Sequence, residues 1–398
     1  MAPIKSSLAR TVGKLLGVYK DTDLSLRGDV QSSRFIDTAA QGTLSATGGS
    51  TYTSGDYKLH VFTTSTPSPE RNLVVSNAEP NATVEIMLIG SGGSGAPDQG
   101  SGGGGGGVVW TDNGGIVISD GTYPITISPN SQDNAPSPGN PSSARGGDTI
   151  FNPGGSGIVL TAKGGGFGGY FSPYVTNANY RDGGCGGGMG NMPGAAGHPD
   201  GGYPSYGPRG ADGYQPTQSQ TFPTDENVLG NTATVLSQGF AGGGADSNAV
   251  TDPSGSGGGG GGAGERGYAG HSHSGVTPSN NWGRGGNGYQ VPAPFLDPFK
   301  PVIPNPFLNI GHSDPGFRYF GGGGGGSDFN NNSGSGRGFG VPGGLGGGGR
   351  GAIDPGPGSQ NGTAGLNHRG GGGGGGSTHG GWGRAGGSGC CIIKYKFQ

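Results

Sequence analysis

The stretch at residues 102–110 reads GGGGGGVVW, six glycines followed directly by two valines and a tryptophan. Similar glycine runs occupy residues 257–262, 321–326 and 370–376. Glycine loses more conformational freedom on folding than any other residue, so an ordered run of glycines is costly. The runs are therefore either flexible filler, or segments in which the fold requires backbone without side chains.

The composition favours the second interpretation. Gly contributes 101 and Pro 30 of the 398 residues, an excess that usually indicates low complexity when it has no fixed period. Collagen is excluded because the chain has no sustained Gly-X-Y repeat. Disordered chains combine few aromatic residues with a high net charge, whereas aromatic residues here make up 8% and the net charge is −3. We therefore predict an ordered structure built on glycine.

A glycine run can adopt the left-handed extended helix with three residues per turn, which has no internal hydrogen bonds. The N–H and C=O groups of such a helix must then pair with neighbouring segments. Only glycine lets several such helices approach closely enough for that pairing, as at the axis of collagen. The predicted fold class is thus mainly β plus polyglycine II helices, in which a small antiparallel β module continues into a slab of packed polyglycine helices with long loops.

The β module is predicted over residues 51–163, after a small and polar linker at 37–50. β-branched and aromatic clusters separated by Gly, Pro, Asn and Asp predict strands at 57–62, 72–76, 82–90, 116–119, 123–128 and 158–162. Within the third of these, Val84, Ile86 and Leu88 alternate with Thr83, Glu85 and Met87. That alternation is typical of a half-buried strand.

Residues 164–398 form the predicted glycine-rich slab. Regular signals return only at 232–237 and in the last strand, 390–397, which we expect to return to the β module and close the unit. Insertions between the glycine runs contain aromatic residues among Asn, Ser, Gly and Pro, a palette that antibody loops also use. We predict that these loops bind a receptor, although the same aromatic residues could instead cap the slab against water. The candidates are Tyr170, Phe171, Tyr174, Tyr180, Tyr203, Tyr206, Trp282, Phe317 and Tyr319.

Residues 1–36 differ from the rest, with dense positive charge and no glycine run. Apolar residues at helical spacing predict a short amphipathic helix. Its apolar face consists of Ile4, Leu8, Val12, Leu15, Leu16 and Tyr19. Gly13 and Gly17 each weaken a helix by about 1 kcal/mol relative to Ala, so this helix needs a partner. The partner could be another protein, the chain's own domain or a membrane surface.

In the order of its motifs the chain resembles the glycine-rich domain of bacteriophage tail-fibre and related virion proteins. The motifs are YKLHVFTTS, ATVEIMLIGSGGSG, SDGTYPITISP, GGDTIF and TAKGGGFGG, with GGSGCCIIKY at the end. The likeness covers about residues 50–398 and is strong at its two ends, although Cys390 and Cys391 replace the usual aliphatic residues. The opening KSSLARTVGKLLG is similar to a particle-attachment segment of podovirus-like phages, and the domain is more distantly similar to fibre-tip adhesins of T-even-like phages.

The resemblance implies a non-enzymatic virion protein, a tail fibre or adhesin assembled in the host cytoplasm. Its N-terminal segment would dock on other virion proteins of the tail, fibre or capsid. Its loops would bind a host cell-surface polysaccharide or outer-membrane protein. Fibres are commonly homotrimers, whereas a slab can also close within one chain. The alternative is a capsid or tail decoration protein with the same fold and no receptor role.

Other function classes have weak support in the sequence. The RGG triplets at 145–147, 284–286 and 369–371 are isolated in a slightly acidic chain, so we expect no nucleic-acid binding. His271 and His273 lack further ligands, and we expect no metal or cofactor. No Ser/His/Asp set, Cys–His pair or paired carboxylate indicates catalysis. No apolar stretch approaches 18 residues, so we expect no membrane insertion.

Overall fold

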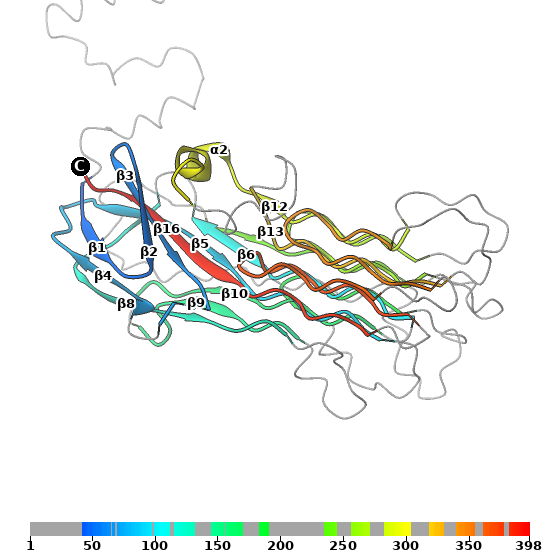
Figure 1. Cartoon of the computed structure of the whole chain (residues 1–398). Coiled ribbons are helices and arrows are strands. Elements are labelled where there is room, and N and C mark those ends of the chain that lie inside the picture. The colour runs from blue at the N-terminus through cyan, green and yellow to red at the C-terminus, as the bar shows by residue number, and fades with distance from the viewer. Residues whose placement is uncertain are drawn as a thin grey trace, which may run out of the picture.

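The computed structural model describes residues 42–131, 145–169, 183–190, 235–244, 256–270, 282–303, 318–329, 340–354, 361–377 and 382–398, apart from 65, 68–69, 98, 112–114 and 156. The described chain is mainly β, with antiparallel sheets and very little helix. Two parts follow one another along the long axis of the molecule, a pair of β-sheets and an elongated bundle of glycine-rich segments (Figure 1). We call the first part the sandwich and the second the slab.

The first sheet of the sandwich has five antiparallel strands. In spatial order they are β1 (Ser45–Thr47), β4 (Asn72–Ser76), β8 (Gly121–Ile127), β9 (Thr149–Phe151) and β10 (Leu160–Ala162). Burial alternates along these strands, so that Leu73 and Val75 face inward while Val74 between them is exposed. This is the pattern of a sheet with one face on the core and one face in solvent.

The second sheet lies against the first and is centred on the carboxy-terminal strand. In spatial order its strands are β11 (Val235–Gln238), β6 (Val108–Thr111), β5 (Thr83–Ile89), β16 (Cys390–Lys396), β3 (Tyr57–Phe62) and β2 (Ser50–Ser54), and β7 (Ile116–Val117) also pairs with β5. Ile393 of β16 lies opposite His60 on one side and Ile86 on the other. β2 and β3, from the first part of the described chain, are thus joined in one sheet with β16 from its last part.

The main core fills the space between the two sheets. Its largest buried side chains include Phe62 and Tyr395 from the second sheet and Leu73 and Phe151 from the first. Burying apolar side chains of this size from both sheets is the dominant stabilising contribution to such a sandwich.

A second core covers the opposite face of the seven-stranded sheet. The segment at residues 291–303 falls within the predicted glycine-rich slab at 164–398, but it packs on the sheet. Its helix α2 (Ala293–Leu296) and 3₁₀ turn η6 (Asp297–Phe299) bury Phe295, Leu296 and Phe299 against strand residues such as Leu59. The prolines that suggested a loop restrict the backbone, while the aromatic residues between them supply the buried surface.

Two further expectations need correction. β5 is covered on both faces, because Met87 and Ile89 contact the second core while Ile86 and Leu88 contact the first, so it is not a half-buried strand. The expected linker at 37–50 is only partly described, and its described part is not a linker. Leu44 is buried in the sandwich, β1 pairs with β4, and β2 begins at Ser50. Short polar residues concealed these strands, because each strand buries few side chains.

The slab continues directly from the sandwich strands, so that β5 runs into segment 90–96, run 102–107 into β6, and segment 383–389 into β16 (Figure 1). Its backbone hydrogen bonds repeat every three residues. Within run 102–107, the first and fourth glycines donate to one neighbouring segment, the second and fifth to another, and the third and sixth to a third. The acceptors, in chain order, are the carbonyls of Gly258, Gly373, Gly166, Gly261, Gly370 and Lys163, at 2.7–3.0 Å.

Fourteen glycine-rich segments of the described chain form four hydrogen-bonded layers. From one face to the other, the first layer contains segments 163–169, 183–189 and 240–244, and the second contains 90–96, 102–107, 257–262 and 265–270. The third layer contains 383–389, 370–376, 321–326 and 283–288, and the fourth contains 362–366, 348–352 and 341–345. Each of the four unbroken glycine runs is bonded to six neighbouring segments, so all four occupy the interior of the slab. Side chains occur mainly in the outer segments.

The interior glycines have no room for a side chain. A Cβ built on Gly103, Gly260 or Gly323 would lie closer than 3.0 Å to a backbone oxygen of a neighbouring segment. Backbone, unlike the end of a flexible side chain, cannot move aside without disturbing the hydrogen bonds that it makes. The glycine runs are therefore required by close packing in the slab.

We expect acid to destabilise the sandwich through His60. Its Nδ1 donates to the carbonyl of Gly48 at 2.6 Å, which leaves Nε2 to accept from the hydroxyl of Tyr395 at 3.1 Å. Burial lowers the pKa of His60 below its ordinary value of 6.5. Because the unfolded chain then binds more protons, stability is fully present above about pH 6.5 and decreases as the pH falls toward the lowered pKa.

The measurement is the free energy of unfolding of the wild type and of His60→Gln between pH 8 and pH 5. The variant should be less stable at pH 8, because it loses the neutral imidazole's contacts, and its stability should change less with pH. Burial also lowers the pKa of His368, so some pH dependence should remain in the variant. Equal pH slopes for the two proteins would contradict the assignment to His60.

Candidate functional site

The two ends of the slab have different surroundings. Its proximal end joins the sandwich strands, and its distal end lies opposite (Figure 1). Most consecutive segments run in opposite directions, so the chain repeatedly reaches the distal end and returns, but 163–169, 183–189 and 240–244 all run from the proximal to the distal end. Five intervals of the sequence outside the described residues are joined to the distal end at both of their ends, namely 245–255, 271–281, 330–339, 355–360 and 378–381. Two more, 170–182 and 191–234, leave from it.

Side chains first appear in the interior of the slab where each glycine run meets the distal end. The four residues there are Ser101, Ser256, Ser327 and Ser377, each at most 5% exposed. The hydroxyl of Ser101 lies 2.9 Å from the carbonyl oxygen of Gly169 and 2.7 Å from that of Gly188. The hydroxyls of Ser327 and Ser377 are buried without a hydrogen-bond partner. We call the surface formed by these four serines the distal platform.

Two tryptophans lie at this platform. Trp282 precedes segment 283–288 and is half-buried, and Trp382 precedes segment 383–389 and is 55% exposed. Sequence reasoning singled out Trp282 but missed Trp382. The signal that could have found it is a repeated motif, because WGRGGN at 282–287 and WGRAGG at 382–387 share the order Trp-Gly-Arg before a glycine-rich segment.

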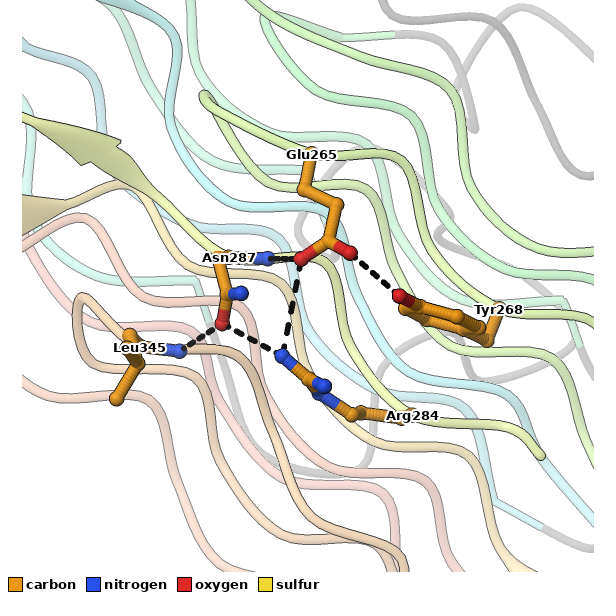
Figure 2. Close-up of polar contacts among 5 residues, drawn as sticks. All are labelled: Glu265, Tyr268, Arg284, Asn287 and Leu345. Carbon is orange, nitrogen blue, oxygen red and sulfur yellow. Dashed lines mark hydrogen bonds and ion pairs between the residues drawn. The ribbon is translucent and has the colours of Figure 1, made fainter. Parts of the chain in front are cut away.

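A polar cluster occupies the side edge of the slab formed by segments 265–270, 283–288 and 341–345 (Figure 2). The carboxylate of Glu265 accepts from the Tyr268 hydroxyl at 2.5 Å and from the Asn287 N–H at 3.2 Å. Arg284 lies 3.7 Å from the same carboxylate. This carboxylate therefore joins two neighbouring segments.

Asn287 and Arg284 extend the cluster to the third segment. The Asn287 side-chain oxygen accepts from Arg284 Nη2 at 2.9 Å and from the Leu345 N–H at 3.0 Å (Figure 2). The hydrogen bond to Glu265 raises the pKa of Tyr268, since it favours the protonated phenol. Arg284 and Asn287 are three residues apart, which is the interval at which hydrogen-bond partners repeat along a slab segment. Their side chains therefore lie on the same side of segment 283–288. The cluster stabilises the side edge by hydrogen bonds between its own members.

Arginines of the RGG triplets take part in the fold. Arg284 belongs to the polar cluster above. Arg369 is 3% exposed, its guanidinium lies 4.9 Å from the ring centre of Phe320, and its Nη1 donates to the Tyr319 carbonyl at 2.7 Å. Two of the three RGG arginines, Arg284 and Arg369, thus make contacts within the fold.

The three cysteines are buried free thiols. Burial raises the pKa of Cys185 and of Cys390 to about 12, so both are protonated near neutral pH. A thiol rather than a thiolate is a poor nucleophile and a poor metal ligand. Within the described ranges, no three or more His, Cys, Asp or Glu side chains gather where they could hold a metal ion.

The predicted site residues fall in different places. All six attachment residues, Ile4, Leu8, Val12, Leu15, Leu16 and Tyr19, lie outside the described residues, as do Tyr170, Phe171, Tyr174, Tyr180, Tyr203, Tyr206 and Phe317. Tyr319 does not lie at the distal end. It is in β13 (Tyr319–Phe320), which pairs with β12 (Tyr289–Gln290) at the proximal end. The interval 304–317 is joined to this same end, because it connects the segment after η6 to β13.

The described helices offer no membrane-spanning candidate, since none combines sufficient length with sufficient apolar character. The model of a protein family described as a glycine-rich domain matches residues 70–295, more than half of the chain. The match begins just before β4 and ends within α2, and so includes sandwich strands and slab segments alike. No curated protein and no solved structure matches the chain.

Proposed function

The chain belongs to the glycine-rich domain family, and we propose that it is a bacteriophage virion protein, a tail fibre or adhesin whose slab presents loops to a host-surface receptor. The proposal has three parts, which concern the conformation of the slab, the loops at its distal end and the attachment of the N-terminal segment. Each part has its own support and its own test.

The slab segments are polyglycine II helices in this proposal. Two observations support that conformation, namely the repeat of hydrogen-bond partners every three residues and the six neighbours of each interior run. A helix with three residues per turn and no internal hydrogen bonds directs its N–H groups to three sides in succession. Such a scaffold is rigid, because a shift of one segment breaks hydrogen bonds to several others.

The loops at the distal end are the proposed binding surface. The observation that carries this part is that five intervals of sequence are joined to the distal end at both of their ends and two more start from it. Tyr170 and Tyr174 follow directly after the distal end of segment 163–169, whereas Tyr180 precedes Gly183 at the proximal end. Binding residues concentrate in loops that a rigid scaffold positions, as in antibodies. The receptor is a surface polysaccharide or an outer-membrane protein of the host.

The N-terminal segment 1–36 attaches the protein to other virion proteins, through the apolar face that includes Leu8 and Leu15. The described chain begins at Gly42, next to β1 at the sandwich end of the molecule. Attachment there would direct the distal end of the slab away from the particle. Deletion of residues 1–36 should therefore leave a folded protein that is not incorporated into particles. Normal incorporation would contradict the attachment role.

The receptor role is tested with the purified full chain on susceptible and resistant host cells. Tyr170→Ala, Phe171→Ala and Tyr174→Ala combined should reduce binding to susceptible cells at least tenfold. The matched control combines Thr47→Ala, Val74→Ala and Thr126→Ala on the exposed face of the five-stranded sheet, and it should bind like the wild type. Equal binding to both kinds of cell would contradict receptor recognition. Particles that lack the protein and still adsorb normally would instead indicate a decoration protein.

A further inference from the structure

We propose that Trp382 and Trp282 form a two-point stacking site for a sugar chain of the host-surface polysaccharide. The inference rests on the proposed receptor role and narrows it to one class of ligand and one pair of residues. It assigns a contact to Trp382, which the pattern of aromatic insertions did not single out.

The first observation is the exposure of Trp382. At 55% it is the most exposed large hydrophobic side chain among the described residues, ahead of Val302 and Val74. Its neighbours in the sequence are Gly381 and Gly383, which have no side chain to cover the indole. A large aromatic side chain left in water contributes less to folding than a buried one, whereas tryptophan is enriched at binding surfaces.

The second observation is the repetition of the same arrangement in the slab. Segments 283–288 and 383–389 both run from the distal to the proximal end, and they occupy the two outer positions of one layer. The interior runs 321–326 and 370–376 lie between them in that layer. The two Trp-Gly-Arg motifs therefore lie at the two sides of the distal platform, and the runs between them end in Ser327 and Ser377.

The third observation is that hydrogen bonds hold the backbone beside each indole. After Trp382, the Arg384 N–H donates to Gly374 at 3.0 Å, the Arg384 carbonyl accepts from Gly95 at 2.8 Å, and Arg384 Nε donates to Gly362 at 3.1 Å. After Trp282, Gly283 donates to Ala269 and accepts from Gly326, both at 2.8 Å. Ligand binding therefore need not order this backbone, which favours affinity.

The glycine of each motif is required by its position. A Cβ on Gly383 would collide with the carbonyl of Gly95, and Gly283 has a φ of +65°, which L side chains rarely adopt. Each tryptophan is thus followed by a position that favours glycine, Gly283 because of its φ and Gly383 because of close packing.

The chemistry of the site favours a sugar chain over other partners. The apolar C–H face of a pyranose ring stacks on the flat face of an indole, and a linear polymer can contact two separated indoles at once. A nucleic acid would need a basic surface, whereas the chain has a net charge of −3 and Arg284 is engaged with Glu265. A protein hot spot is normally surrounded by packed contacts that exclude water, whereas Trp382 is 55% exposed.

The three tryptophans of the chain allow a direct test by fluorescence. Trp110 is 9% exposed within the second core, so an aqueous quencher should act mainly on Trp282 and Trp382. The probe is surface polysaccharide purified from susceptible host cells, with polysaccharide from resistant cells as the control. In the full-length Trp282→Phe variant, where Trp382 reports, the susceptible polysaccharide should reduce acrylamide quenching at least twofold. The resistant polysaccharide should have no effect.

Affinity gives the second measurement. Trp382→Ala should weaken binding of the susceptible polysaccharide at least tenfold, whereas Val302→Ala, an exposed hydrophobic position after η6, should not change it. Unchanged quenching together with unchanged affinity would overturn the inference. If Trp382→Ala still bound susceptible cells normally, the inference would fail and the receptor role would stand. If the wild-type chain bound neither polysaccharide nor cells, the receptor role itself would fail.

Discussion

Gly260→Ala is expected to lower the free energy of unfolding by about 3 kcal/mol, at the upper end of what overpacking of an interior costs. Gly260 is in the middle of run 257–262, and an added Cβ would collide with the carbonyl oxygen of Gly103. Neither residue can move freely. Gly260 donates to Gly324 at 2.8 Å and accepts from Gly286 at 2.9 Å, while Gly103 accepts from Gly324 at 2.8 Å.

The cost arises because the added methyl group forces the slab segments apart or breaks these hydrogen bonds. Each lost backbone hydrogen bond costs about 1 kcal/mol, and more if its partner stays buried. The control is Gly121→Ala, at an exposed strand position where an added Cβ would meet only the Tyr123 ring at 3.6 Å or more. This control should change stability by less than about 0.5 kcal/mol. Denaturant unfolding of both variants gives the comparison, and equal stabilities would contradict an interior position for the run.

The sequence predicted the strands whose large apolar side chains give a clear pattern. The predicted strands at 57–62 and 72–76 coincide with β3 and β4, because clusters of β-branched and aromatic residues bounded by turn residues favour strands. The strand at 390–397 was expected to return to the β module, and β16 lies between β3 and β5. Short strands such as β1 escaped notice, because three residues with small side chains carry too weak a periodic signal.

The arrangement of the slab could be anticipated only in outline. Glycine runs indicate close backbone packing, but identical glycines carry no information about which segments are neighbours. The six-neighbour positions of the four runs therefore required the structure, as did the proximal location of Tyr319. The polar cluster around Glu265 was equally hidden, because its members come from segments that only the slab brings together. Outer segments tolerate side chains at positions three residues apart, which explains the spacing of Arg284 and Asn287.

Ile393→Ala is expected to destabilise the whole described fold by about 3 kcal/mol, within the usual range for truncating a buried isoleucine. Ile393 is fully buried in the main core, at the centre of the seven-stranded sheet. Val74→Ala provides the control, because Val74 is 40% exposed on the outer face of the other sheet and its loss should cost less than about 0.5 kcal/mol.

The same variant tests whether sandwich and slab unfold together. β16 continues without a break from segment 383–389, which donates from Gly387 to Gly371 at 2.7 Å in the interior run 370–376. If opening of that run requires global unfolding, Ile393→Ala should accelerate amide exchange in 370–376 about 100-fold, as 3 kcal/mol implies. Exchange that stayed at the wild-type rate would show that the slab opens independently of the sandwich. A hundredfold acceleration would mean that packing of the sandwich strands helps to keep the distal platform rigid, although the strands and the platform lie at opposite ends of the slab.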